Sequence, residues 1–347
     1  VLHIMAKLAK FLQGAAGAGG GAGPDVEDVF STYLYEGNSS TQTITNGIDL
    51  DGEGGLVWVK SRDASSDHEL NDTERGVGKR IASNQAYAEQ SNSDVSAFNS
   101  NGFDLRYQSG LGNASGEDYA SWTFRKAPKF FDVVTYTGDG SNRTIAHSLG
   151  SDVGMLIVKR LDSAKSWAVF HRQFNSGSAP ANYWDQLNNA QAIQSNSTIW
   201  NNTAPTSSVF SLGTANVVNQ SGGTYVAYLF AHNDGDGGFG PDGDADIIKC
   251  GSYTGNGSTN GPEIDLGFEP QWLLVKSASS ADVWMMTDNM RGMINSTDGN
   301  NNVNYLKANT SDAESGFSGK FNLTSTGFKI TDGGSIINGS GNTYIYM

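Results

Sequence analysis

Hydrophobic and polar residues alternate in short stretches along most of the chain, and this alternation predicts β-strands. Residues 133–136 and 167–170 have a period of two, which is typical of half-buried strands. No long stretch after residue 24 has the helical period of about 3.6 residues. Turn-forming residues interrupt the strands at short intervals, so we expect an all-β protein with antiparallel sheets.

The same order of four strand patterns occurs three times along the chain. Each repeat opens with a strand that carries a tyrosine before a turn; these are Tyr35, Tyr136 and Tyr253. An apolar strand that ends in a lysine follows; these are Lys60, Lys159 and Lys276. A turn with an aromatic residue comes third, at 101–105, 207–212 and 325–330. A tyrosine-containing strand closes each repeat, at 118–124, 224–230 and 343–347.

This triplication predicts tandem antiparallel β-sandwiches, in which the apolar strands that end in lysine are central. The expected boundaries are 25–130, 131–231 and 248–347, with a linker rich in Asp and Gly at 232–247. The pattern at 343–347 is that of the middle of a strand, so we expect the third repeat to be incomplete at its C-terminus.

A different pattern occupies the first residues, where apolar side chains recur at steps of three and four. They are Val1, Ile4, Met5, Leu8, Phe11 and Leu12. This spacing predicts a short amphipathic helix whose apolar face serves anchoring or oligomerisation. A flexible Gly-rich linker follows, so that 1–24 forms a tethered N-terminal segment. A signal peptide is the alternative, although Lys7 and Lys10 interrupt the apolar stretch.

Composition and charge narrow the class of protein. The chain has 44 Gly and only 7 Pro among 347 residues, while aromatic residues make up 10%, so we expect a folded chain with many turns. Its 22 basic and 36 acidic residues give a net charge of -14, which disfavours nucleic acid as a partner. No run of 18 apolar residues is present, so no membrane-spanning helix is predicted.

Candidate catalytic and metal-binding residues give no recognisable site. The five histidines are scattered singly and are interpreted as surface or turn residues; they are His3, His68, His147, His171 and His232. Acid pairs fall in predicted loops, where solvated carboxylates are usual; they are Glu69 with Asp72 and Glu74, and Asp282 with Asp288. Cys250 is the single cysteine and cannot form an internal disulfide. We therefore predict no catalytic residue, no enzyme activity and no cofactor.

Two groups of residues are weak binding candidates. Asp242, Asp244 and Asp246 could offer oxygen ligands to calcium, but their segment lacks the EF-hand pattern and is better interpreted as a solvated linker. Trp184 and Trp200 fall in the long loop of the second repeat, where they could stack on a glycan. Three other tryptophans are expected in core strands; they are Trp58, Trp122 and Trp272.

The YTGNG turn, the apolar strand ending in VK, the TGF turn and the closing TYVAYLF together resemble virion structural proteins of tailed marine bacteriophages, including cyanophages. The resemblance covers residues 30–347. It implies tandem concanavalin-like or jelly-roll modules and a place on the phage tail or particle surface. It carries over no functional residue. The first repeat departs from the pattern, since it has Glu36 in place of the turn Thr and no Gly after Asn38.

The function expected from this resemblance is that of a tail fibre or appendage, anchored by its N-terminus and involved in host attachment. Other virion proteins would be its partners, and a homotrimer is favoured by the habit of phage fibres. One alternative is a capsid decoration protein. A second is a module that binds or cleaves a host surface glycan through Trp184, Trp200 and an acid such as Asp185. A third is a bacterial surface adhesin with calcium in its Asp-rich linker.

Overall fold

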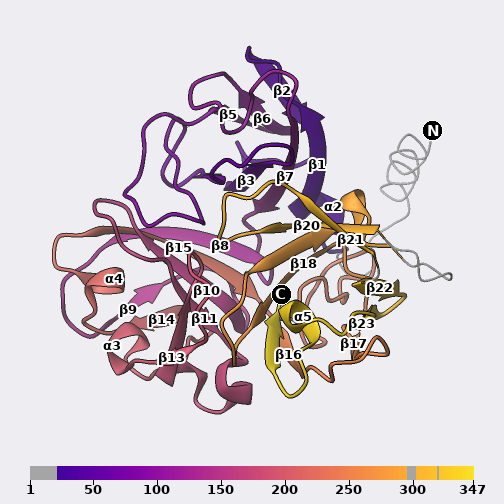
Figure 1. Ribbon diagram of the computed structural model, residues 1–347. Coiled ribbons are helices and arrows are strands. Elements are labelled where there is room, and N and C mark those ends of the chain that lie inside the picture. Colours follow the sequence, from indigo (N-terminus) through magenta and orange to yellow (C-terminus); the bar gives the residue numbers. More distant parts are fainter. Residues whose placement is uncertain (1–21, 295–301, 319) are drawn as a thin grey trace.

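The computed structural model describes residues 22–294, 302–318 and 320–347 (Figure 1). They form antiparallel β-sheets joined by loops and a few short helices, which confirms the predicted all-β fold class. The N-terminal helix predicted from Val1 to Leu12, with its whole apolar face, lies outside the described residues.

The first repeat contains a main sheet and a smaller second sheet. A short helix, α2 (Val26–Val29), leads into it. The main sheet has the order β1 (Phe30–Glu36), β7 (Asp118–Arg125), β3 (Gly55–Ser61) and β4 (Glu69–Asp72). The small sheet has the order β2 (Gln42–Thr45), β6 (Gly102–Leu105) and β5 (Val95–Asn99).

The second repeat follows the same plan with a wider main sheet. Its order is β13 (Gln194–Ser195), β12 (Tyr183–Gln186), β11 (Ala168–His171), β10 (Val153–Arg160), β15 (Thr224–Ala231) and β8 (Phe131–Thr137). The small sheet pairs β14 (Val209–Leu212) with β9 (Arg143–Ala146). Short helices occupy the loops; they are η1 (Phe174–Gly177), η2 (Pro180–Asn182), α3 (Ser197–Trp200) and α4 (Asn216–Asn219).

The third repeat again has two sheets. The main sheet has the order β16 (Gly251–Thr254), β24 (Thr343–Tyr346), β18 (Trp272–Ser277), β19 (Met285–Asp288), β20 (Asn302–Lys307) and β21 (Ser315–Ser318). The small sheet has the order β17 (Glu263–Asp265), β23 (Gly327–Ile330) and β22 (Phe321–Thr324). Two short helices complete the repeat; they are η3 (Asn289–Arg291) and α5 (Ser335–Asn338).

The three main sheets share one strand order: opening strand, closing strand, apolar strand and the strand after it. The apolar strands β3, β10 and β18 each lie between two neighbours, as the sequence predicts. Nearly every residue of these strands is buried, because one face packs on the small sheet and the other faces the middle of the molecule. Their continuous apolar sequences follow from this double burial.

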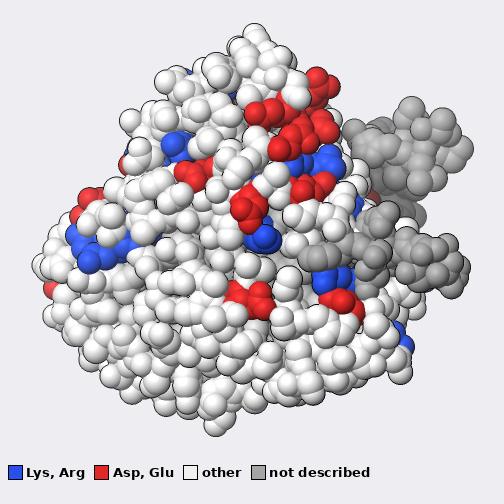
Figure 2. Space-filling view, in the orientation of Figure 1, with Lys and Arg blue, Asp and Glu red and all other residues white. Residues whose placement is uncertain are grey.

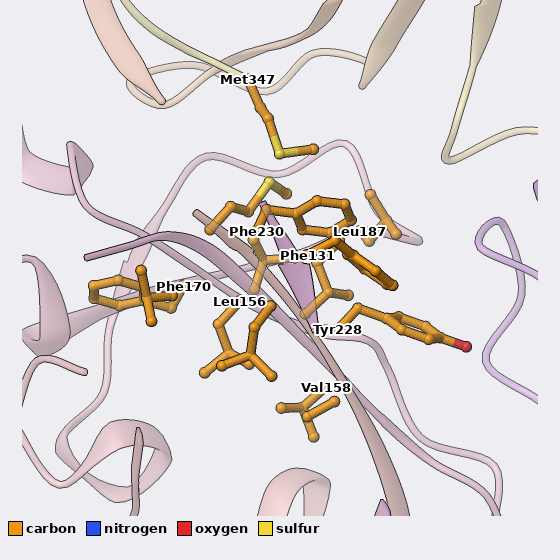
Figure 3. Close-up of a cluster of buried hydrophobic side chains, with 14 of the residues drawn as sticks. Phe131, Leu156, Val158, Phe170, Leu187, Tyr228, Phe230 and Met347 are labelled. Carbon is orange, nitrogen blue, oxygen red and sulfur yellow. The ribbon is translucent and has the colours of Figure 1, made fainter. Parts of the chain in front are cut away.

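One hydrophobic core joins the three repeats. It includes Trp58 and Trp122 of the first repeat, Phe230 of the second, and Trp272 and Met347 of the third. In Figure 1 the repeats lie at the top, the lower left and the lower right around this centre, and Figure 3 shows part of the core. Smaller clusters fill the space between the two sheets in the first and third repeats. The repeats therefore do not form separate tandem bodies, because their main sheets cover one another.

The Asp- and Gly-rich segment 232–247 is folded onto the core. Phe239 is only 2% exposed and forms an isolated bridge with Ala245. The buried Asn233 side chain donates a hydrogen bond to the Lys129 carbonyl at 2.8 Å. The interpretation of this segment as a wholly solvated linker is therefore wrong, since an apolar and an amide side chain fix it to the body of the protein.

Candidate functional site

Each repeat carries the same tyrosine pair beside its first turn. The stacked pairs are Tyr35 with Tyr119 at 5.2 Å between ring centroids, Tyr136 with Tyr225 at 5.0 Å, and Tyr253 with Tyr344 at 5.1 Å. A buried asparagine accepts a hydrogen bond from the backbone of the turn; the residues are Asn113, Asn219 and Asn338. These contacts hold three exposed polar turns, which begin at Asn38, Asp139 and Asn256.

The lysine at the end of each apolar strand is fully buried. Lys159 Nζ donates hydrogen bonds to the carbonyls of Ala86, Arg160 and Lys165 at 3.2, 2.9 and 2.9 Å. Since Ala86 belongs to the first repeat, this lysine links two repeats. Loss of water around the charged form lowers the pKa of Lys159 to about 7 and that of Lys60 to about 8.

The same position after each lysine carries a ring that contacts a neighbouring repeat; the residues are His68, Trp167 and Trp284. The Trp167 indole of the second repeat donates hydrogen bonds to two carbonyls of the first, at Ala82 and Gln85, both at 3.0 Å. The Trp284 indole of the third repeat donates to the Gln186 carbonyl of the second at 3.1 Å. The His68 Nε2 atom lies 3.1 Å from the Lys307 carbonyl of the third repeat. The second repeat thus contacts the first, the third contacts the second, and the first contacts the third, so the contacts form a closed cycle.

A second cycle runs through the end of the strand that follows each apolar strand; its residues are Asp72, His171 and Asp288. Tyr228 of the second repeat donates to Asp72 of the first at 2.7 Å. His171 Nε2 lies 3.1 Å from the Tyr346 carbonyl of the third repeat. Trp122 of the first repeat donates to Asp288 of the third at 2.9 Å. Arg75 and Arg291 pair with the two aspartates. We call the two cycles the inter-repeat joints.

These joints correct two sequence-based interpretations. His68 and His171 are buried rather than at the surface, and burial lowers the pKa of both side chains to about 3, so they are neutral. Asp72 and Asp288 are buried and paired on strands rather than solvated in loops. Alignment of the three repeats on their lysines places Asp72, His171 and Asp288 at equivalent positions. This recurrence is the sequence signal that could have identified them.

The candidate glycan residues of the second repeat lie in different environments. Trp184 is half-buried on β12. Trp200 is 1% exposed and packs edge-on against Phe170, so its ring has no face free for a ligand. Asp185 is fully buried, 3.8 Å from Lys276, and burial raises its pKa to about 7. Asp185 therefore belongs to the contact between the second and third repeats, and the glycan role remains a prediction for Trp184 alone.

The three aspartates that were weak calcium candidates, Asp242, Asp244 and Asp246, also lie in different environments. Asp246 accepts backbone hydrogen bonds from Gly235 and Gly237 at 2.8 and 3.0 Å and lies 3.6 Å from Lys249. Asp242 and Asp244 are exposed. Within the described residues, no three His, Cys, Asp or Glu side chains gather in a way that could hold a metal ion.

An apolar pocket of about 170 Å³, which no sequence pattern predicted, lies between the first repeat, the third repeat and segment 232–247. Its walls include Phe30, Phe124, Ile248, Trp272 and Met347. The Trp272 side chain is buried, and its Nε1 atom has no hydrogen-bond partner among the described residues. We call this cavity the apolar pocket.

The fold and the joints define an all-β protein built from three interlocked repeats. The chain belongs to the family described as "Domain of unknown function (DUF7483)", which matches residues 25–347. No curated protein and no solved structure matched the chain. Among the helices of the described residues, none has the length and apolar character needed to cross a membrane.

Proposed function

We propose that the protein is a structural component of a tailed-bacteriophage particle, a tail fibre or appendage module that takes part in host attachment without catalysing a reaction. The resemblance to phage virion proteins supports this proposal, because its motifs run through all three repeats. The residues of those motifs include the stacked tyrosines, the buried lysines and the closing strands.

The inter-repeat joints are the observation that carries the proposal. Asp72, Asp288, His68 and His171 are each bonded across a boundary between repeats. Buried polar groups that are fully paired favour one unique arrangement of a core. Three repeats fixed in one arrangement suit a virion component, because such a component must keep its shape outside a cell and transmit force between the particle and the host surface.

The outer surface is suited to binding a receptor rather than to catalysis. The turns that begin at Asn38, Asp139 and Asn256 expose amide, carboxylate and hydroxyl groups, which can hydrogen-bond to sugar hydroxyls. Figure 2 shows that charged side chains on the visible face are few and lie between broad uncharged areas. A receptor with many hydroxyl groups, such as a host surface glycan, fits this surface.

The position of the protein on the phage particle tests this proposal. Antibodies raised against residues 25–347 and coupled to gold are applied to purified particles of the phage that encodes this chain, and the particles are viewed by electron microscopy. We expect the gold to label tail appendages. Gold over the head would assign the protein to capsid decoration. Intact and disrupted particles without label, beside a control antibody that labels the capsid, would overturn the proposal.

A further inference from the structure

Charged side chains link the third repeat to the first. Arg291 donates a hydrogen bond from Nη1 to Glu314 Oε2 at 3.1 Å. Arg62 of the first repeat donates to both oxygens of the same carboxylate, from Nε to Oε2 at 3.0 Å and from Nη2 to Oε1 at 2.8 Å. The backbone N–H of Glu314 donates to the Arg62 carbonyl at 2.7 Å. Glu314 therefore binds one guanidinium group from each side of the boundary.

The boundary between the first and second repeats has most of the same arrangement. Arg75 donates from Nη1 to Glu89 Oε2 at 3.2 Å, and the backbone N–H of Glu89 donates to the Leu161 carbonyl at 2.8 Å. Leu161 and Arg62 each lie two residues after the buried lysine of their repeat. The backbone N–H of each donates to the first residue of the closing strand at 2.8 Å. Leu161 is therefore the counterpart of Arg62, and this boundary lacks the second guanidinium group.

A cavity of about 380 Å³ lies at this boundary, and both Glu89 and Leu161 line it. We call it the polar cavity. The counterpart of the oxygen that binds Arg62 Nη2 is Glu89 Oε1, which accepts no hydrogen bond from the residues that the structure describes. Lys79 Nζ lies 3.8 Å from this oxygen, and the Lys79 side chain is 49% exposed. One carboxylate oxygen on the wall of the cavity is thus open to a stronger donor.

The other acids of the polar cavity already have close partners. Glu74 pairs with Lys126 at 2.7 Å, and Asp162 pairs with Arg160 at 2.9 Å. Glu89 is therefore the acid with free capacity. A guanidinium group presents a planar fork of N–H donors that matches a carboxylate, whereas an alkylammonium group is a point charge. The geometry at Glu314 shows that such a fork fits an acid in this position.

We propose that the polar cavity is a binding site for a guanidinium group. The group donates two hydrogen bonds to Glu89, in the way that Arg62 does to Glu314, and its alkyl chain lies against Leu161. The group belongs to a small molecule or to an arginine side chain of another protein. This inference is independent of the proposed phage function, because it depends only on contacts within the chain.

The experiment titrates the full chain with n-butylguanidinium. The matched probe is n-butylammonium, which has the same charge and alkyl chain without the fork of donors. Ligand-observed NMR measures both dissociation constants. We expect the guanidinium probe to bind about tenfold more tightly, because it makes a bidentate contact. Equal binding of the two probes, or no binding of the guanidinium probe, would overturn the proposal.

Three variants locate the bound probe. Glu89→Gln weakens the acceptor, and Leu161→Arg supplies a competing guanidinium group, so each should weaken binding about tenfold. Asp152→Asn is the control, because it makes the same change of charge at a side chain that is 74% exposed and does not line the cavity. Binding to the control should be unchanged. Unchanged binding to both site variants, or an equal loss in the control, would overturn the proposal.

A stability measurement tests the geometry without a ligand. Glu89→Gln is introduced into the Leu161→Arg protein and, as the matched comparison, into the Leu161→Met protein. We expect the melting temperature to fall on the order of 2 °C more in the Leu161→Arg background, because only there does Glu89 bind a second guanidinium group. An equal fall in the two backgrounds would mean that a guanidinium group at this position does not reach Glu89, which would overturn the proposal.

A capped tripeptide, acetyl-Gly-Arg-Gly-amide, distinguishes the two sources of the group. If the tripeptide binds as tightly as n-butylguanidinium and the Leu161→Arg substitution weakens its binding, the site accepts an arginine side chain of another protein. If only n-butylguanidinium binds, the main chain of the peptide does not fit and the ligand is a small molecule. Both results support a guanidinium site and select its occupant.

Discussion

The indole of Trp122 donates a hydrogen bond of 2.9 Å to the carboxylate of Asp288, which lies 166 residues further along the chain. Trp122 belongs to the first repeat and Asp288 to the third, so this bond closes the second cycle of inter-repeat joints. Arg291 lies over the Trp122 ring, 5.2 Å from its centroid, and pairs with the same carboxylate. The first and third repeats are thereby in direct contact, although they are not neighbours in the sequence.

Replacing Trp122 by Phe is expected to lower the free energy of unfolding by about 1–3 kcal/mol, because the buried carboxylate of Asp288 loses a donor. Urea unfolding at pH 7 measures the change. The matched control is Trp184→Phe, since Trp184 is half-buried and no hydrogen bond of its indole is involved in the joints. Equal losses in the two variants would show that the Trp122 bond contributes nothing.

Replacing Asp288 by Ala is expected to cost more, about 3–5 kcal/mol, because it removes the nearest acid from the buried guanidinium of Arg291. The control is Asp312→Ala, which breaks an ion pair with Lys307 at an acid side chain that is 51% exposed. That change should cost less than about 1 kcal/mol. A loss for Asp288→Ala as small as the control would contradict the assignment of this residue to a buried joint.

The buried histidines predict a pH dependence of stability. In the folded state the pKa of His68 and of His171 is about 3, against about 6.5 in an unfolded chain. As the pH falls below 6.5 the unfolded state takes up protons first, so the free energy of unfolding falls by up to about 1.4 kcal/mol per pH unit for each histidine.

Urea midpoints at pH 7, 6 and 5 measure this slope, in a range where most carboxylates stay ionised. His68→Gln and His171→Gln should each flatten the dependence, and the double variant should flatten it further. If both variants keep the full slope of the parent protein, the histidines are not the groups responsible.

The turn glycines Gly37, Gly138 and Gly255 are expected to resist substitution. A Cβ atom at Gly255 would lie 2.4 Å from the Gly339 carbonyl oxygen, well inside van der Waals contact. Gly255→Ala should therefore cost about 1–3 kcal/mol. Gly112→Ala is the control, because its Cβ would meet no atom nearer than 3.4 Å. Thermal melting compares the two, and equal shifts would contradict the steric argument.

Much of the fold could be predicted from the local pattern of the sequence. Strand periodicity and the threefold recurrence of tyrosine, lysine and aromatic turn predicted the all-β fold and the central place of the apolar strands. These signals are local, since each depends on side chains within a few residues of one another. Which faces of the main sheets meet is not local, and for that reason the shared core was not predicted.

The joints were missed for a related reason. A lone histidine or an isolated acid in a single repeat resembles a solvated residue, and only the comparison of His68 with Trp167 and Trp284 shows a common position. The rings differ, yet each reaches a carbonyl of another repeat. The apolar pocket could not be predicted either, because its walls come from 246–249, 266, 268–273, 346–347 and the first repeat, which the sequence does not relate to one another.

The central claim is that the three repeats fold as one body. Differential scanning calorimetry of the protein tests it most directly, because it yields both the total heat of unfolding and the van't Hoff enthalpy of the transition. We predict one transition in which the two enthalpies agree, and agreement should be lost in Asp288→Ala. Two or three separate transitions in the parent protein, each with the enthalpy of about one repeat, would contradict the claim.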